Sequence, residues 1–266
     1  MLKENQNPLE LSFEDFLNII RGMSKTCAVD DLENLAVTFV KNGEWLVRLV
    51  DGIRGSRKQI ATMCASSLQP LVDDLEKNLK AQIRPFYFHD VEMKFIRVHN
   101  YLSQNRPPKT NMIATSAVSH PTALIGANAM RVVYDPASMD RPMKMLHMGN
   151  VVIGDGVDIG PHATIHRASL GSTVIGDYNH IGSYVNIGHN VKTGKYCAFT
   201  PYVCVGGSTH IADNVVVGMG SIIRDNIRIC SDVRIGQGSN VVKTIDEPGV
   251  YYGSPAIRQG EWDGRW

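Results

Sequence analysis

The sequence predicts a mainly β fold, in which a left-handed parallel β-helix follows a small N-terminal α/β domain. Three observations support this prediction: a six-residue repeat fills the second half of the chain, the first hundred or so residues lack it, and a proline-rich stretch lies between the two parts. Of the 266 residues, 43% are hydrophobic and 20% are charged, which is ordinary for a chain that buries a proper core.

The repeat is clearest from Ile175, where eleven six-residue units follow one another without a gap, beginning IGDYNH, IGSYVN, IGHNVK and TGKYCA. The first residue of every unit but one is apolar, the second is glycine in seven units, and the fifth is mostly small or β-branched. This period indicates short strands joined by tight turns, with the first residue pointing inward and glycine easing the backbone at the bend. Three units then make one triangular coil of 18 residues.

The same pattern occurs earlier, in three units from Ile113 and three from Ile153, so that 17 units predict nearly six coils. With strands about 4.8 Å apart, such a prism would be roughly 27 Å tall. Two interruptions are expected, a short one at 171–174 and a much longer one at 131–152. A loop as long as the second on a regular solenoid is usually functional or faces a partner. We place the β-helix at 112–244, with a tail at 245–266.

The first part, residues 1–104, alternates helical and strand patterns. Helices are predicted at SFEDFLNIIRGM, LQPLVDDLEKNLKA and VEMKFIRVHNYLSQ, and strands at KQIATMCAS and IRPFYFHD. This alternation is typical of a small α/β domain, here with a possible nucleotide-binding role. Residues 105–111 form the expected linker, because two adjacent prolines stop a helix and stiffen the connection.

Composition excludes several classes of partner. A net charge of +1 gives no reason to expect nucleic acid, and no apolar stretch is long enough for a membrane span. The first residues lack a signal-peptide pattern, so we expect a cytoplasmic protein. The five cysteines form no CxxC pair, which argues against a disulfide framework or a zinc cage.

Four segments carry a resemblance to a known family: IATSAVSHPTALIG, TIHRASLGSTVIGD, IGHNV and DEPGVYYGSPA. They resemble the hexapeptide acyltransferases, and most of all the UDP-3-O-acylglucosamine N-acyltransferases of lipid A synthesis, over roughly residues 90–256. TIHR is also similar to the UDP-N-acetylglucosamine O-acyltransferases. The resemblance implies transfer of an acyl group from a thioester to the amine of a nucleotide-linked amino sugar.

His189 is the third residue of its unit, a position that faces outward at a turn. One coil of 18 residues later lies Gly207, and one coil plus the four inserted residues earlier lies Arg167. The expected corner column is therefore Arg167, His189 and Gly207. The alternative is an exposed histidine without a role.

Each residue of this corner suits acyl transfer. A neutral imidazole at His189 can act as general base, a contribution typically worth ~10²- to 10⁴-fold in rate. A backbone N–H at Gly207 can stabilise the oxyanion by ~3 kcal/mol, and in the resembling family a histidine and a glycine at the matching positions have these roles. Arg167 and His166 are candidates for binding the acceptor, unless they are a solvated edge pair. Asn190 either orients His189 or tolerates the turn conformation.

For the donor, the YGSPA segment resembles acetyl-CoA-dependent sugar acetyltransferases, and the helical extension of the carrier-protein-dependent enzymes is not seen after IRQGEWDGRW. Both points favour acyl-CoA, in particular acetyl-CoA. Arg258 and Lys243 are candidate contacts for its phosphates, or else only solvated basic residues. Flat solenoid faces usually close in a C₃ trimer, so we expect a homotrimer with each site between two subunits.

Three alternatives remain open. One is an acyl-carrier-protein-dependent lipid A N-acyltransferase. Another is a zinc enzyme like the γ-carbonic anhydrases, which share this fold. Its candidate ligands, at differing positions in the repeat, would be His162, His166, His180 and His210. The last is a non-catalytic binding protein. Because no three histidines share a corner, we expect no metal.

Overall fold

The computed structural model describes residues 107–260 except 136–137, and earlier in the chain the strands 25–26, 36–40, 60–65 and 83–88 with residues 95, 96, 99, 100 and 103. The chain divides into two compact units. Unit 1 comprises residues 1–107 and 130–146, and unit 2 comprises residues 108–129 and 147–266.

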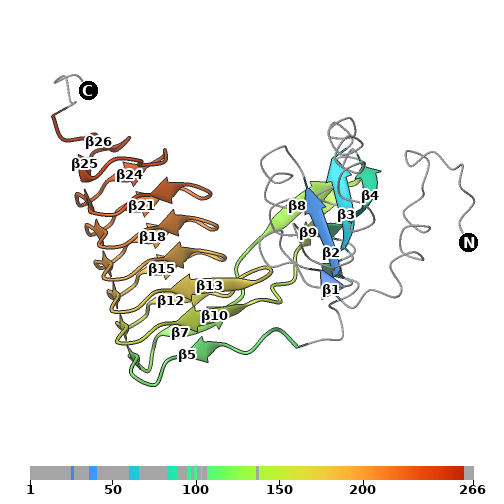
Figure 1. Ribbon diagram of the computed structural model, residues 1–266, viewed down its shortest axis with the longest axis horizontal. Coiled ribbons are helices and arrows are strands. Elements are labelled where there is room, and N and C mark those ends of the chain that lie inside the picture. Colours follow the sequence, from blue (N-terminus) through green and yellow to red (C-terminus); the bar gives the residue numbers. More distant parts are fainter. Residues whose placement is uncertain are drawn as a thin grey trace, which may run out of the picture. The chain divides into compact units, whose positions relative to one another are not determined.

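Unit 2 is a parallel β-helix of six coils, each contributing one short strand to each of three parallel sheets (Figure 1). The first sheet contains β5 (Met112–Ile113), β10 (Asn150–Ile153), β13 (Ser172–Ile175), β16 (Lys192–Thr193), β19 (His210–Ile211) and β22 (Arg228–Ile229). The second contains β6 (Val118–Ser119), β11 (Asp158–Ile159), β14 (His180–Ile181), β17 (Ala198–Phe199), β20 (Val216–Val217) and β23 (Val233–Ile235). The third contains β7 (Leu124–Ala127), β12 (Thr164–His166), β15 (Asn186–Ile187), β18 (Cys204–Val205), β21 (Ile222–Ile223) and β24 (Asn240–Val241).

The six-residue period sets the core of this β-helix, as the sequence predicts. Between Ile175 and Ile235 every first-position side chain is buried, and so is every fifth-position side chain between Asn179 and Ser239. Strands in successive coils pair 18 residues apart, as in His180 with Ala198. The mainly β fold and the count of coils are therefore confirmed.

The conformational reason for the second-position glycines differs from the one expected. The positive φ angles lie at the fourth position of each unit, for example 58° at Tyr184 and 60° at Asn190. Gly188, at a second position, is needed for a different reason: a Cβ there would lie 2.6 Å from the Gly207 nitrogen in the next coil. These glycines therefore permit coils to stack closely and do not supply the bend.

Two of the polar residues buried in the β-helix, Asn179 and Thr193, are hydrogen-bonded to each other. Asn179, at a fifth position, is fully buried and donates from Nδ2 to Thr193 Oγ1 at 2.7 Å and to the Gly194 carbonyl at 2.9 Å. Its Oδ1 accepts the Cys197 N–H. Thr193 is the one polar first-position residue between Ile175 and Ile235, and it is hydrogen-bonded to the buried Asn179 side chain.

Both interruptions of the repeat leave the β-helix at the same corner, between a strand of the third sheet and the next strand of the first. The four extra residues lie in the turn at 167–171, because residues 172–175 form β13. The long insertion runs from 128 to 149, because residues 150–153 form β10. Within it, β8 (Val132–Asp135) and β9 (Ser138–Lys144) form an antiparallel hairpin that belongs to unit 1.

Unit 1 also contains a four-stranded parallel sheet in the order β1 (Lys25–Thr26), β2 (Ala36–Val40), β3 (Ile60–Ala65) and β4 (Ile83–Phe88). The last two are the strands that the sequence predicts, whereas the first two were not predicted. Helical residues occur at Phe95, Ile96, His99, Asn100 and Ser103, within the helix predicted there. The other two predicted helices lie outside the described residues.

The described chain ends in β25 (Gly249–Tyr252), which extends the second sheet beyond the sixth coil, and β26 (Ile257–Arg258), which pairs with it in antiparallel fashion. Across the described segments of both units, none of the helical residues belongs to a helix long and apolar enough to traverse a bilayer.

Candidate active site

His189 and Gly207 lie against each other at the corner that carries the interruptions. His189 is on the turn between β15 and β16, and Gly207 is on the turn between β18 and β19, one coil further along. A Cβ on Gly207 would lie 2.8 Å from Nε2 and 2.9 Å from Cε1 of His189. The bare Cα of Gly207 therefore packs directly on the imidazole.

The neighbouring Asn190 defines which nitrogen of His189 carries hydrogen. Asn190 Oδ1 accepts the Ser169 N–H at 3.0 Å, and its Nδ2 donates to the Leu170 carbonyl at 2.6 Å, so the carboxamide has one orientation. Oδ1 also lies 3.1 Å from His189 Nδ1. Because Oδ1 can only accept, Nδ1 carries the hydrogen, and in the neutral imidazole the lone pair is on Nε2, the nitrogen that faces Gly207.

The backbone of Asn190 is also fixed. Its N–H donates to Thr173 Oγ1 at 2.8 Å, and its φ of 60° lies in the left-handed region that asparagine tolerates. Asn190 therefore lies in the turn with its side chain against the imidazole, and a role in orienting His189 stays a prediction.

Gly207 offers an N–H beside the imidazole. On either side of it in the chain, Gly206 N–H donates to the Ile223 carbonyl and Ser208 N–H donates to the His189 carbonyl, each at 2.8 Å. Within the described residues, Gly207 N–H makes no hydrogen bond. The corner thus brings together a basic nitrogen and an open backbone donor.

Arg167 lies one coil before His189, as the repeat predicts, but its side chain bonds to the scaffold. Its Nε donates to the Gly126 carbonyl at 2.7 Å, its Nη1 to the Gly149 carbonyl at 3.5 Å, and its backbone N–H to the Ala127 carbonyl at 2.9 Å. The guanidinium thus ties the irregular turn at 167–171 to the coil before it. A role in binding the acceptor stays a prediction.

His166 is half-buried, with Nε2 3.3 Å from Asn186 Nδ2. Burial is the largest influence on its pKa, which is lowered from the usual value for histidine, while hydrogen bonds with the backbone at Asn128 and Ala127 oppose the shift. A lowered pKa keeps this imidazole neutral near pH 7. It can therefore offer an acceptor of hydrogen bonds to a substrate, but not a fixed positive charge.

His147, which the sequence did not single out, also reaches this corner. Its side chain is only 4% exposed, and its ring lies edge-on to that of His189, with centroids 5.6 Å apart and an interplanar angle of 64°. It sits at the end of the long insertion, where no repeat gives a residue a phase. No pattern in the sequence could have placed it here.

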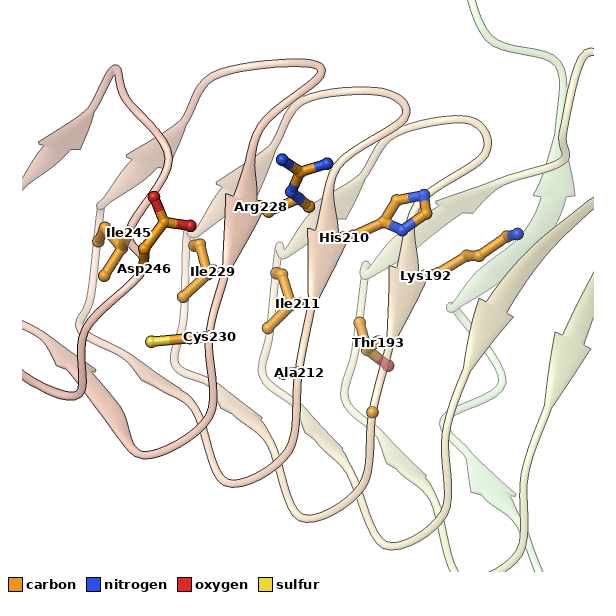
Figure 2. Close-up of a pocket in the computed structure, with 11 residues that line it drawn as sticks. Lys192, Thr193, His210, Ile211, Ala212, Arg228, Ile229, Cys230, Ile245 and Asp246 are labelled. Atoms are coloured by element: carbon orange, nitrogen blue, oxygen red, sulfur yellow. The ribbon is translucent and has the colours of Figure 1, made fainter. Parts of the chain in front are cut away.

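A shallow groove of about 440 Å³ lies on the outer face of the first sheet (Figure 2). The side chains of Lys192, His210 and Arg228, from β16, β19 and β22, line it, and so does the carboxyl group of Asp246. Figure 2 shows the three basic side chains on the outer side of the sheet, and we call this surface the basic groove. They occupy the sixth position of units one coil apart. The 18-residue spacing of these three residues is the signal in the sequence that could have located the groove.

The two basic residues that the sequence proposed for donor binding lie elsewhere. Arg258 Nη1 lies 2.7 Å from Glu247 Oε2, and its Nη2 donates to the Pro248 carbonyl at 3.0 Å. Lys243 is exposed, on the turn after β24. Neither residue lines the basic groove.

The histidines of the zinc alternative do not converge. His162 stacks on Tyr184 with ring centroids 4.8 Å apart, and His180 lies 3.8 Å from Asp158. The described part of the chain contains no group of three or more His, Cys, Asp or Glu side chains that could hold a metal ion.

The stacked coils and the histidine corner define a hexapeptide-repeat β-helix protein. Within this class, the resemblance to UDP-3-O-acylglucosamine N-acyltransferases is confirmed by sequence relatives of that name. The chain is 38% identical over 151 residues to a probable UDP-3-O-acylglucosamine N-acyltransferase 2, mitochondrial, from Arabidopsis thaliana, a match that covers 56% of this chain and 49% of the relative. It is 34% identical over 142 residues to the UDP-3-O-acylglucosamine N-acyltransferase from Bordetella avium, a match that covers 53% of this chain and 39% of the relative.

The chain thus spans about half or less of the length of these relatives. Among solved structures, it is similar to a perosamine N-acetyltransferase variant from Caulobacter crescentus in complex with CoA and GDP-perosamine. That match has 16% identity and a TM-score of 0.39, and it covers 85% of this chain and 96% of the other. No protein-family model matches the chain.

Proposed function

We propose that this protein is an acyltransferase that moves an acyl group from a thioester to the amine of a nucleotide-linked amino sugar. The observation that carries the proposal is the pairing of His189 with Gly207, because the lone pair of the imidazole and an open backbone N–H face one small region. General-base catalysis and oxyanion stabilisation are the two contributions that this reaction needs.

In the proposed reaction, the amine nitrogen attacks the thioester carbon and loses a proton to His189 Nε2. The negative charge that develops on the carbonyl oxygen is stabilised by Gly207 N–H. When the tetrahedral intermediate collapses, the C–S bond breaks and the departing thiolate takes the proton from His189. The products are an amide and a thiol, and Asn190 keeps the imidazole in the tautomer that can begin the next cycle.

For the acceptor, the names of the sequence relatives support UDP-3-O-acylglucosamine over other nucleotide-linked amino sugars. This favours the lipid A type of reaction, which the sequence alone leaves open as an alternative. For the donor, the basic groove suits the phosphate of a phosphopantetheine arm, which acyl-CoA and acyl-carrier protein share. We retain acyl-CoA as the donor expected from the sequence, with the carrier protein as its competitor.

An acceptor and donor grid tests this function. UDP-3-O-acylglucosamine and nucleotide-linked 3-amino and 4-amino sugars are each combined with acetyl-CoA, hydroxyacyl-CoA and hydroxyacyl-carrier protein, and mass spectrometry detects the amide. We expect product with UDP-3-O-acylglucosamine, and its formation should be at least about 100-fold slower in the same reactions with His189→Ala. Absence of amide in every combination, from folded protein, would contradict the proposal.

We further propose a homotrimer with one site between each pair of subunits, as expected for a solenoid with flat faces. Sedimentation equilibrium should give three times the chain mass of 29.3 kDa. Activity per chain should fall on dilution below the dissociation constant of the trimer. A monomer with full activity would rule this assembly out.

A further inference from the structure

We propose that His147 is a positioning residue, which holds the imidazole of His189 in the plane that keeps Nδ1 on Asn190 and Nε2 toward Gly207. This inference rests on the proposed acyl transfer and adds to it a role for the long insertion. His147 does not act on the substrate in this proposal. It acts through His189, against whose ring its own ring packs edge-on at 5.6 Å.

The segment that carries His147 is held by hydrogen bonds on both sides. Met148 and Gly149 donate their N–H groups to the carbonyls of Ser169 and Ala168, each at 3.0 Å, and Lys109 N–H donates to the Met148 carbonyl at 2.9 Å. These bonds join the end of the insertion to the turn at 167–171. A ring anchored on this segment can resist rotation of a neighbour.

The same turn is tied to Asn190. The Ser169 N–H and the Leu170 carbonyl both bond to the Asn190 carboxamide, which also meets His189 Nδ1. A continuous series of contacts therefore runs from the insertion through the turn at 167–171 to the imidazole. His147 completes it, because its ring lies against the imidazole.

His189 needs such support because of the residue on its other side. Gly207 has no side chain, which leaves its N–H open. For the same reason, Gly207 offers no side chain for the Nε2 side of the imidazole to pack against. His189 itself is only half-buried. The buried ring of His147 adds to the restraint that the contact between Nδ1 and Asn190 Oδ1 places on rotation of the imidazole.

The test compares side chains of different shape at position 147. His147→Leu fills the buried space without a flat ring, and His147→Phe restores the ring without a titratable nitrogen. We expect His147→Leu and His147→Ala to lower kcat by about 10- to 100-fold, because small displacements of a catalytic group have effects of this size. KM for both substrates should stay within about threefold, and His147→Phe should recover kcat to within about threefold of wild type.

A matched control uses another stacked histidine of the same fold. His162 stacks on Tyr184, on the turn between β11 and β12. His162→Ala should leave kcat unchanged. Thermal melting of each variant separates loss of positioning from loss of folding.

A second readout needs no substrate, so it separates failure of this inference from failure of the proposed function. The ¹⁵N chemical shifts of His189 at a pH where it is neutral should show Nδ1 protonated and Nε2 unprotonated in wild type and in His147→Phe. In His147→Leu the two shifts should move toward each other, because the ring then samples both tautomers.

A double-mutant cycle completes the test. If His147 acts by keeping Nδ1 on Asn190, then His147→Leu should cost little more in the Asn190→Ala background. Additive losses would overturn the proposal. So would unchanged tautomers in His147→Leu, wild-type kcat in that variant, or a His147→Phe variant as impaired as His147→Leu.

Discussion

Replacing His189 by alanine is expected to lower kcat by at least about 100-fold, because the variant has no group to take the proton from the attacking amine. KM should change little, since the loss falls on the transition state more than on binding of the substrates. Initial rates measured from release of the thiol, at saturating acceptor and donor, provide the check. The imidazole packs on Gly207 and on His147 at the edge of the coils, outside the buried core, so the fold should persist.

His180 provides the matched control for this variant. It lies on the second sheet, and its side chain is 70% exposed. His180→Ala should retain wild-type kcat and melting temperature. A His189→Ala protein that transfers acyl groups as fast as wild type would eliminate the general-base mechanism.

Gly207→Ala is expected to reduce kcat by about 10²- to 10³-fold, the range seen when an oxyanion donor is lost. The new Cβ would meet Nε2 of His189 at 2.8 Å, so the imidazole must move away and the approach to the N–H narrows. The backbone itself accepts alanine, because Gly207 is not among the residues with positive φ. Rates and thermal melts of the same preparation give the measurement.

A second-position glycine shows the contrasting outcome. A Cβ on Gly182 would meet backbone atoms of the next coil, 2.8 Å from the Phe199 oxygen and 2.9 Å from the Pro201 nitrogen. Gly182→Ala should therefore lower the melting temperature, which Gly207→Ala should not. The kcat of the His189→Ala/Gly207→Ala double variant should be little lower than that of His189→Ala, because both substitutions disable the same catalytic pair. Wild-type kcat in Gly207→Ala would contradict the assignment of this glycine.

The sequence predicts the β-helix well because position within a six-residue unit determines burial. The same counting brings His189 and Gly207 together, since residues one coil apart must stack. The basic groove obeys this rule too: Lys192 and His210 are paired residues of neighbouring strands. The six-residue period therefore determines both which side chains form the core and which surface residues of successive coils lie next to each other.

Counting fails where the chain leaves the repeat. His147 belongs to an insertion, so its position depends on hydrogen bonds that the repeat does not predict, such as those of residues 148–150 with the turn at 167–171. The position of Arg167 was predictable, but not its partners, because the carbonyls of Gly126 and Gly149 become available only at an irregular corner. The glycine pattern was visible, but whether it reflects a φ angle or close contact depends on the adjacent coil.

The order of the coils has a consequence for how the protein loses structure. In a solenoid, each layer is stabilised mainly by its two neighbours, so opening begins at the terminal layers and progresses inward. The turn with His189 joins the third and fourth of the six described coils, and the turn with Gly207 joins the fourth and fifth. The pair thus lies in the central coils, away from both ends. Amide exchange should be slowest in these central coils.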